Sequence, residues 1–231
     1  MIGFDPLYLI MLAPVLLFSL WASARVKSSF TKYSQVRSQS GITGAEAAMR
    51  ILRAYDLHDV RVEQTSGWLS DHYSPAERVL RLSEAVYGSS SIAAIGVAAH
   101  EAGHALQHGK GYAVMGLWQM LAKPAAIGSN LSYWLIIAGA LLTSFQFLMI
   151  VGVILFGVVV LFQIVTLPLE FNASSRAKKL IVEMGILGQQ EAAGVSRVLG
   201  AAAMTYVAAA ISSVTTMLYY LIRFGILGSR D

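Results

Sequence analysis

Three long stretches of this chain carry no charged residue and consist mostly of apolar side chains. The first covers residues 6–24, the second covers residues 124–169, and the third lies between Arg197 and Arg223. A helix of about 20 apolar residues spans the hydrocarbon core of a bilayer, which is roughly 30 Å thick. The first and third stretches therefore each predict one transmembrane helix.

The second stretch is too long for one span and long enough for two. A turn at residues 143–146 would divide it into spans over 127–143 and 147–168. Composition points the same way, because 56% of the residues are hydrophobic, 13% are charged and the mean hydropathy is +0.60. We predict a mainly α-helical membrane protein with about four transmembrane helices.

Residues 40–90 are the one part of the chain whose pattern is typical of a soluble fold. Thr43 and Glu46 form a capping-box pattern ahead of apolar residues at helical spacing. Short alternating runs at 60–63 and 78–82 predict two strands, which we expect in a small antiparallel sheet. This α+β portion is too small to bury a large core alone, so we expect it to pack on the membrane helices.

A further helix is predicted after this portion. Residues 92–99 are apolar on every side, which is typical of a buried helix. Ser90 or Ser91 can cap its first turn, and Gly109 favours its end.

The sequence His-Glu-Ala-Gly-His at residues 100–104 lies in this helix. Positions i and i+4 share one helix face, so His100 and His104 can bind one metal ion there. Glu101 lies beside that ion, where it can take a proton from water. The motif indicates zinc-dependent hydrolysis, with one zinc ion per chain.

His108 continues the same stripe but is a poor candidate for the third ligand. At about 1.5 Å per residue, it stands about 12 Å from His100 along a straight helix. One ion that also binds His104 cannot bridge that distance with bonds of about 2 Å. We expect His108 to support the site from the end of the helix.

Glu170 is the better candidate for the third ligand, because it is the first charge after the second apolar stretch. Ala173 and Ala177 follow on its helix face, and small residues there let another helix approach closely. Two histidines and one glutamate would leave the fourth zinc position for water. The alternative is a carboxylate that merely reaches the membrane interface.

Other residues offer weaker candidates. Glu183 and Glu191 are rivals of Glu170, but both lie near two glycines (residues 185 and 188) where a helix break is expected. His72 or Tyr73 could polarise a substrate carbonyl or simply hold a loop. A strand beside a zinc site can bind an extended peptide through its main chain.

Three separated segments resemble those of the YugP-type neutral zinc metallopeptidases of bacterial membranes. They are residues 70–75 (Ser-Asp-His-Tyr-Ser-Pro), 100–108 (His-Glu-Ala-Gly-His-Ala-Leu-Gln-His) and 168–177 (Pro-Leu-Glu-Phe-Asn-Ala-Ser-Ser-Arg-Ala). More distantly, the chain is similar to zincin-like membrane gluzincins related to HtpX and to the CAAX prenyl endopeptidases.

This resemblance implies that His100, His104 and Glu170 bind zinc and that Glu101 is the general base. The distant relatives usually carry aspartate four residues after the glutamate ligand, where this chain has Ser174. Ser174 and Arg176 are further candidates for contacts with the ligands or with the substrate.

Positive charge sets the expected orientation in the membrane. Arg25 and Lys27 follow the first span, Lys178 and Lys179 follow the third, and residues 143–146 carry no charge. By the positive-inside rule, both segments that hold the motif residues face the cytoplasm. Because no positive charge precedes the first apolar stretch, that stretch is expected to be an anchor rather than a signal peptide.

We therefore expect a multi-pass protein of the bacterial cytoplasmic (inner) membrane with its active site facing the cytoplasm. The expected organisation is an N-terminal transmembrane anchor (1–24), a cytoplasmic catalytic portion (25–123), a transmembrane hairpin (124–169), a cytoplasmic helix with the third zinc ligand (170–197) and a C-terminal transmembrane helix (198–231).

The favoured function is a membrane-embedded zinc-dependent endopeptidase whose partners are a membrane-associated polypeptide substrate and the lipid bilayer. The alternative is a non-catalytic membrane scaffold that retains a zinc site. Structural zinc sites usually have four protein ligands, often cysteine, and this chain has no cysteine. A transporter is disfavoured because the spans lack interior charges, and no basic stripe suggests a nucleic-acid partner.

Overall fold

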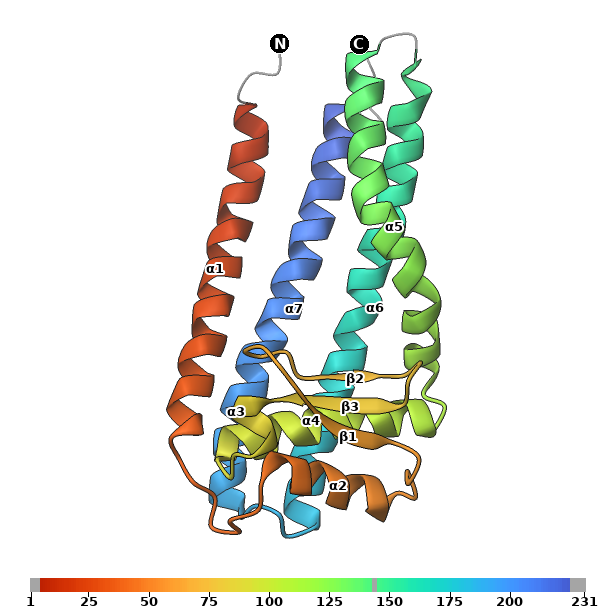
Figure 1. Cartoon of the computed structure of the whole chain (residues 1–231). Helices are drawn as coiled ribbons and strands as arrows, with labels where there is room; N and C mark the ends of the chain where they lie inside the picture. The colour runs from red at the N-terminus through yellow and green to blue at the C-terminus, as the bar shows by residue number, and fades with distance from the viewer. Residues whose placement is uncertain (1–4, 143–144, 225–231) are drawn as a thin grey trace. The chain divides into compact units, whose positions relative to one another are not determined.

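The computed structural model describes residues 5–142 and 145–224, most of which are helical (Figure 1). The elements in chain order are α1 (Pro6–Ser34), α2 (Gly44–Ala54), β1 (Arg61–Thr65), β2 (His72–Ser74), β3 (Val79–Ser83), α3 (Glu84–Tyr87), α4 (Ile92–Gly109), α5 (Ala113–Leu141), α6 (Phe147–Glu183) and α7 (Gln189–Arg223).

The chain divides into two compact units. We call them the helical unit (Met1–Trp21, Leu117–Pro168 and Thr205–Asp231) and the mixed unit (Ala22–Gly116 and Leu169–Met204).

Within residues 5–142 and 145–224, four helices, α1, α5, α6 and α7, are long and apolar enough to cross a membrane. The expected mainly helical chain with about four candidate spans is therefore confirmed. Large apolar side chains on these helices are exposed, Ile127 to 64% and Ile154 to 68%, as expected of surfaces that meet lipid. Of the turn expected at 143–146, residues 143–144 lie outside the described residues. Helix α5 ends before this turn and α6 begins just after it.

The mixed unit is built around α4. Helix α2 packs along α4, and its apolar face is buried at Ala48, Ile51 and Leu52. The capping box is present, because the Glu46 amide donates to Thr43 Oγ1 at 3.2 Å and the Thr43 amide donates to Glu46 Oε2 at 2.7 Å. The end of α6 and the beginning of α7 belong to the same core. In Figure 1 the three strands lie alongside α4.

The sheet has the strand order β1-β3-β2. Strands β2 and β3 are antiparallel, whereas β1 pairs with β3 in parallel, with Arg61 opposite Val79. The expected antiparallel pairing between the runs at 60–63 and 78–82 is therefore wrong. Between these runs, residues 72–74 form a strand that the pattern did not mark, and it takes the antiparallel place beside β3. Strand β1 therefore lies along the other edge of β3 and runs parallel to it.

Helix α4 begins and ends where the sequence indicates. Of the two serines considered, Ser91 is the N-cap, and its side chain accepts a hydrogen bond from the amide of Ala94 at 3.2 Å. The helix ends at Gly109. Most residues between these ends are buried, so the helix carries polar residues into the core of the mixed unit.

Helix α6 continues well past the predicted span and ends at Glu183. The chain turns at Gly185, whose φ of 63° suits glycine, and α7 begins at Gln189. Residues 170–197 therefore comprise the end of one helix, a turn and the beginning of the next. The turn lies at the two glycines that predicted a helix break.

Candidate metal centre

His100 and His104 face one another from adjacent turns of α4. Their Nε2 atoms lie 3.2 Å apart, and the two rings meet edge to face. His100 is buried and His104 is half-buried. Because residues at i and i+4 share a helix face, both Nε2 atoms can bind one ion.

Glu170 reaches the same point from α6. Its Oε2 atom lies 3.1 Å from the Nε2 atom of His100 and 3.6 Å from that of His104. All three residues belong to the mixed unit, and Glu170 is buried. The structure thus brings together the three residues expected to bind metal, although Glu170 is 70 positions from His100 in the sequence.

The rival carboxylates take part in other contacts. Glu183 lies 3.6 Å from Nζ of Lys179, and Glu191 accepts hydrogen bonds from the amides of Gln39 and Gly188. Among the described residues, neither belongs to the cluster of possible metal ligands.

Close contact between α4 and α6 positions Glu170. A Cβ atom on Gly103 would lie only 2.9 Å from the carbonyl oxygen of Ala173, so the two backbones meet where α4 has no side chain. Ala173 and Ala177 are fully buried. Small residues on both helices therefore allow the carboxylate to reach the histidines.

The cluster has the dimensions of a zinc site. Zinc bonds to nitrogen and oxygen of about 2.0–2.1 Å place neighbouring donors of a tetrahedron about 3.3 Å apart. The three separations, 3.1, 3.2 and 3.6 Å, are close to that value. Two imidazoles and one carboxylate are also a ligand set used by catalytic zinc, with one position left open. These residues fit the metal.

Hydrogen bonds to the other ring nitrogens orient both imidazoles. Nδ1 of His100 lies 3.1 Å from Oγ of Ser174, and Nδ1 of His104 lies 2.9 Å from Oε1 of Gln107. The amide oxygen of Gln107 can only accept, so Nδ1 of His104 donates to it. With the proton on Nδ1, Nε2 keeps the lone pair that a metal requires.

Gln107 is fully buried and is held in place by α6. Its Nε2 atom donates to the carbonyl of Leu169 at 2.8 Å and to Oδ1 of Asn172 at 3.1 Å. The same Oδ1 atom accepts a hydrogen bond from Nε of Arg176 at 2.7 Å. These bonds fix which end of the amide faces His104.

Sequence reasoning missed Gln107 and Asn172, although it singled out Ser174 and Arg176 as candidates near the ligands. The available signal was an amide in a helix whose other polar side chains are those of the metal motif and His108. A buried amide requires hydrogen-bonding partners, and Gln107 lies three residues after His104.

Glu101 is buried beside the cluster. Burial raises the pKa of its carboxyl group, and the nearby imidazoles of His100 and His104 oppose that rise. The pKa of the His104 imidazole is also raised. Burial alone lowers it, but the carboxylates of Glu170 and Glu101 outweigh that effect. Glu101 thus has the burial and the charged neighbours of a proton-transfer group.

Tyr73, His108 and His72 lie outside the cluster of possible ligands. The hydroxyl of Tyr73, on β2, lies 2.9 Å from Nδ1 of His108, at the end of α4. This contact links the sheet to the helix. His72 is exposed, and its Nδ1 atom lies 2.8 Å from the carbonyl oxygen of Ser70.

The fold and the cluster together define a class: a helical protein with four candidate membrane spans and a candidate His-His-Glu metal centre. The family described as "Putative neutral zinc metallopeptidase" matches residues 8–225, and the chain belongs to this family. The family resemblance of the three sequence segments is thereby confirmed.

A curated protein of Bacillus subtilis (strain 168), named "Putative membrane protease YugP", is 48% identical to this chain over 225 residues. The alignment covers 97% of this chain and 99% of that protein. No solved structure matches the chain.

Proposed function

We propose that this protein is a membrane-embedded, zinc-dependent endopeptidase that hydrolyses peptide bonds at the cytoplasmic face of the membrane. The observation that carries the proposal is the convergence of His100, His104 and Glu170 at zinc-site distances, with the buried Glu101 beside them. The arrangement matches the gluzincin pattern of a His-Glu-x-x-His helix and a glutamate from a second helix. The family's description names the same chemistry.

The residues divide the work of peptide hydrolysis. His100, His104 and Glu170 would hold one zinc ion, which when bound polarises the scissile carbonyl and makes water easier to deprotonate. Glu101 takes a proton from the attacking water and delivers it to the leaving amine. Burial raises the pKa of Glu101 above its usual value, which suits a carboxyl group that must both accept and release a proton.

The substrate is proposed to be a membrane-associated polypeptide in extended form. Strand β2 is at one edge of the sheet and packs against α4. An extended peptide can pair with such an edge through main-chain hydrogen bonds, whatever its side chains. Tyr73, on this strand, would have to exchange its contact with His108 for the substrate carbonyl in order to polarise it.

The cytoplasmic orientation rests on charge. Arg25 and Lys27 follow the first apolar stretch, and Lys178 and Lys179 follow the third predicted span. Both groups are expected on the cytoplasmic side. The Bacillus relative's name describes a membrane protease of a bacterium.

Zinc content and proteolysis of the purified full-length protein test this function. We expect one zinc ion per chain, cleavage of an unfolded protein such as casein, loss of cleavage with a chelator and recovery with zinc. Glu101→Gln should keep the zinc and lose cleavage by at least about 100-fold, because the amide cannot accept the proton. Zinc at full occupancy in a wild-type protein that cleaves nothing would favour the scaffold alternative. A protein without zinc affinity would contradict the proposal.

A further inference from the structure

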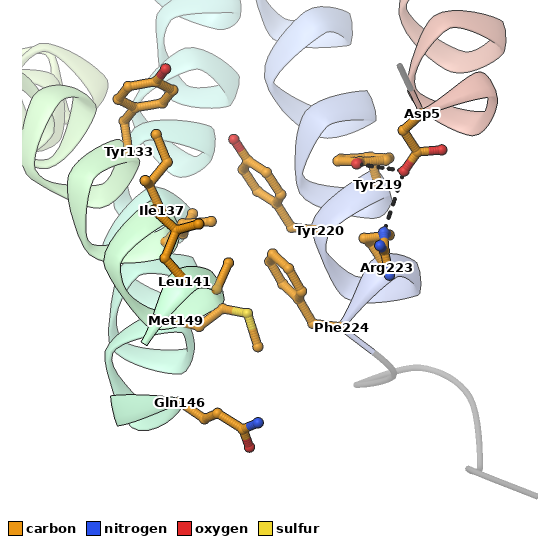
Figure 2. A pocket seen from close by; sticks show the side chains of 13 residues that line it. Asp5, Tyr133, Ile137, Leu141, Gln146, Met149, Tyr219, Tyr220, Arg223 and Phe224 are labelled. Carbon is orange, nitrogen blue, oxygen red and sulfur yellow. Dashed lines mark hydrogen bonds and ion pairs between the residues drawn. The ribbon is translucent and has the colours of Figure 1, made fainter. Parts of the chain in front are cut away.

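The helical unit contains a cavity of about 560 Å³ that lies outside the metal centre (Figure 2). It is lined by residues of α5, α6 and α7, by Gln146 and Phe224 beside the ends of these helices, and by Asp5 just before α1. A cavity of this volume is within the range of pockets that bind small ligands, about 300–1,000 Å³. All its lining residues belong to the helical unit, whereas the three possible metal ligands belong to the mixed unit.

The walls of the cavity are apolar and partly pre-organised. The ring of Tyr220, on α7, and the ring of Phe224, just after α7, stack at 5.8 Å with an interplanar angle of 8°. Figure 2 shows these rings opposite Ile137 and Leu141 of α5 and Met149 of α6. An aromatic wall facing an aliphatic wall suits a hydrocarbon chain.

The polar part of the lining lies at the ends of the helices. The Tyr219 hydroxyl donates to Oδ2 of Asp5 at 2.8 Å, and Nε of Arg223 lies 3.3 Å from the same oxygen. The Arg223 side chain is 60% exposed. A guanidinium group has five N–H donors, so Arg223 keeps donors for a further anionic oxygen. The lining therefore presents one negative and one positive group side by side.

We propose that this cavity binds a zwitterionic phospholipid, with an acyl chain between the aromatic and aliphatic walls. The helices around it are candidate membrane spans, so hydrocarbon chains are the surrounding solvent. The ammonium group of the lipid pairs with Asp5 and its phosphate pairs with Arg223. A lipid phosphate that binds Arg223 competes with Asp5 for that guanidinium group, and only a lipid with an ammonium group gives Asp5 a cation in exchange.

Native mass spectrometry of the purified full-length protein tests the acyl-chain slot. Phosphatidylethanolamine and phosphatidylglycerol with identical acyl chains are added in equal amounts. We expect the wild-type protein to retain phosphatidylethanolamine at least about fivefold more, as expected from an ion pair of moderate strength. Ile137→Trp, which fills the slot, should abolish this retention. Ile127→Trp, on an exposed part of the same helix, should leave it unchanged.

The head-group contacts make a sharper prediction. Asp5→Asn leaves a lone cation at the polar end, so retention should shift toward phosphatidylglycerol. Arg223→Gln removes the partner of the phosphate but leaves Asp5 to pair with the ammonium group, so retention of both lipids should fall while the preference for phosphatidylethanolamine remains. Equal retention of both lipids by the wild-type protein, or full retention by Ile137→Trp, would overturn the proposal. Glu101→Gln should retain lipid like the wild type, which keeps this test independent of peptidase activity.

Discussion

Ser174 and Gln107 each contact Nδ1 of one histidine of the cluster, and both come from positions that carry no charge. A buried polar group left without a partner costs about 1–3 kcal/mol. Each contact therefore satisfies the Nδ1 atom of one imidazole and turns the Nε2 atom of that imidazole toward the point where the three possible metal ligands converge. At this scale, we expect the candidate site to depend on neutral residues as well as on the three possible ligands.

Replacement of Gln107 by leucine should weaken zinc binding by about 10- to 100-fold, because His104 loses the group that fixes its tautomer and orientation. Competition with a fluorescent zinc chelator measures the affinity. Gln190→Leu, at the exposed beginning of α7, is the matched control and should bind zinc like the wild type. Equal affinity in the two variants would show that Gln107 does not position His104.

Glu170→Gln should reduce zinc affinity by about 10-fold or more and abolish cleavage, since a neutral amide is a poor zinc ligand. His108→Ala should keep its zinc, because His108 contacts Tyr73 rather than the cluster. Elemental analysis of both purified variants provides the measurement. Loss of zinc from His108→Ala together with its retention in Glu170→Gln would make our ligand assignment wrong.

At the scale of elements, the site depends on the contact between α4 and α6. The histidines lie on one helix and the glutamate on the other, so their separation depends on how closely the two backbones approach. That approach occurs at Gly103, where a methyl group would lie 2.9 Å from the Ala173 carbonyl oxygen. Since this oxygen belongs to the backbone, a clash can be relieved only by moving a helix.

Gly103→Ala should therefore lower stability by about 1–3 kcal/mol and weaken zinc binding, because α4 must move away from Glu170. Gly116→Ala on α5 is the matched control, since a Cβ atom there meets no other atom within 4 Å. In a helix that substitution should be neutral or stabilising by up to about 1 kcal/mol. Thermal unfolding and zinc titration are measured for both variants. Equal stability and equal zinc affinity in Gly103→Ala and Gly116→Ala would show that the close approach at Gly103 does not position Glu170.

At the scale of the whole molecule, the four candidate spans among the described residues would set how the chain crosses the membrane. An even number of spans would return the C-terminal end to the side on which the chain begins. The segments with the metal-cluster residues follow the first and third spans, so both are expected on the opposite side. Because positive charge follows those two spans, we expect that side to be the cytoplasm.

Single cysteines test this topology, because the chain has none of its own. In Gln35→Cys, just after α1, the thiol should be protected from a membrane-impermeant reagent in intact cells and should react after permeabilisation. In Gln146→Cys, between α5 and α6, it should react in intact cells. Both glutamines are exposed in the structure, so burial would not explain protection. The opposite labelling pattern would place the metal cluster outside the cell.

The sequence by itself determined the helical class, the candidate spans and the histidine pair. Span-length apolar runs predict helices because backbone polar groups in a bilayer must be satisfied within the segment. The i, i+4 spacing placed His100 and His104 on one face because that geometry is local to a helix. Glu170 was also proposed as a ligand, on weaker grounds, from its place after a long uncharged stretch.

Only the tertiary structure decided which distant groups meet. The parallel pairing of β1 with β3 depends on a short strand, residues 72–74, that alternation of apolar residues did not reveal. The hydrogen bonds of Gln107 to Leu169 and Asn172 join α4 to α6 across more than 60 positions. Such contacts are set by the packing of small residues between helices, and a local pattern carries no information about which backbone lies opposite.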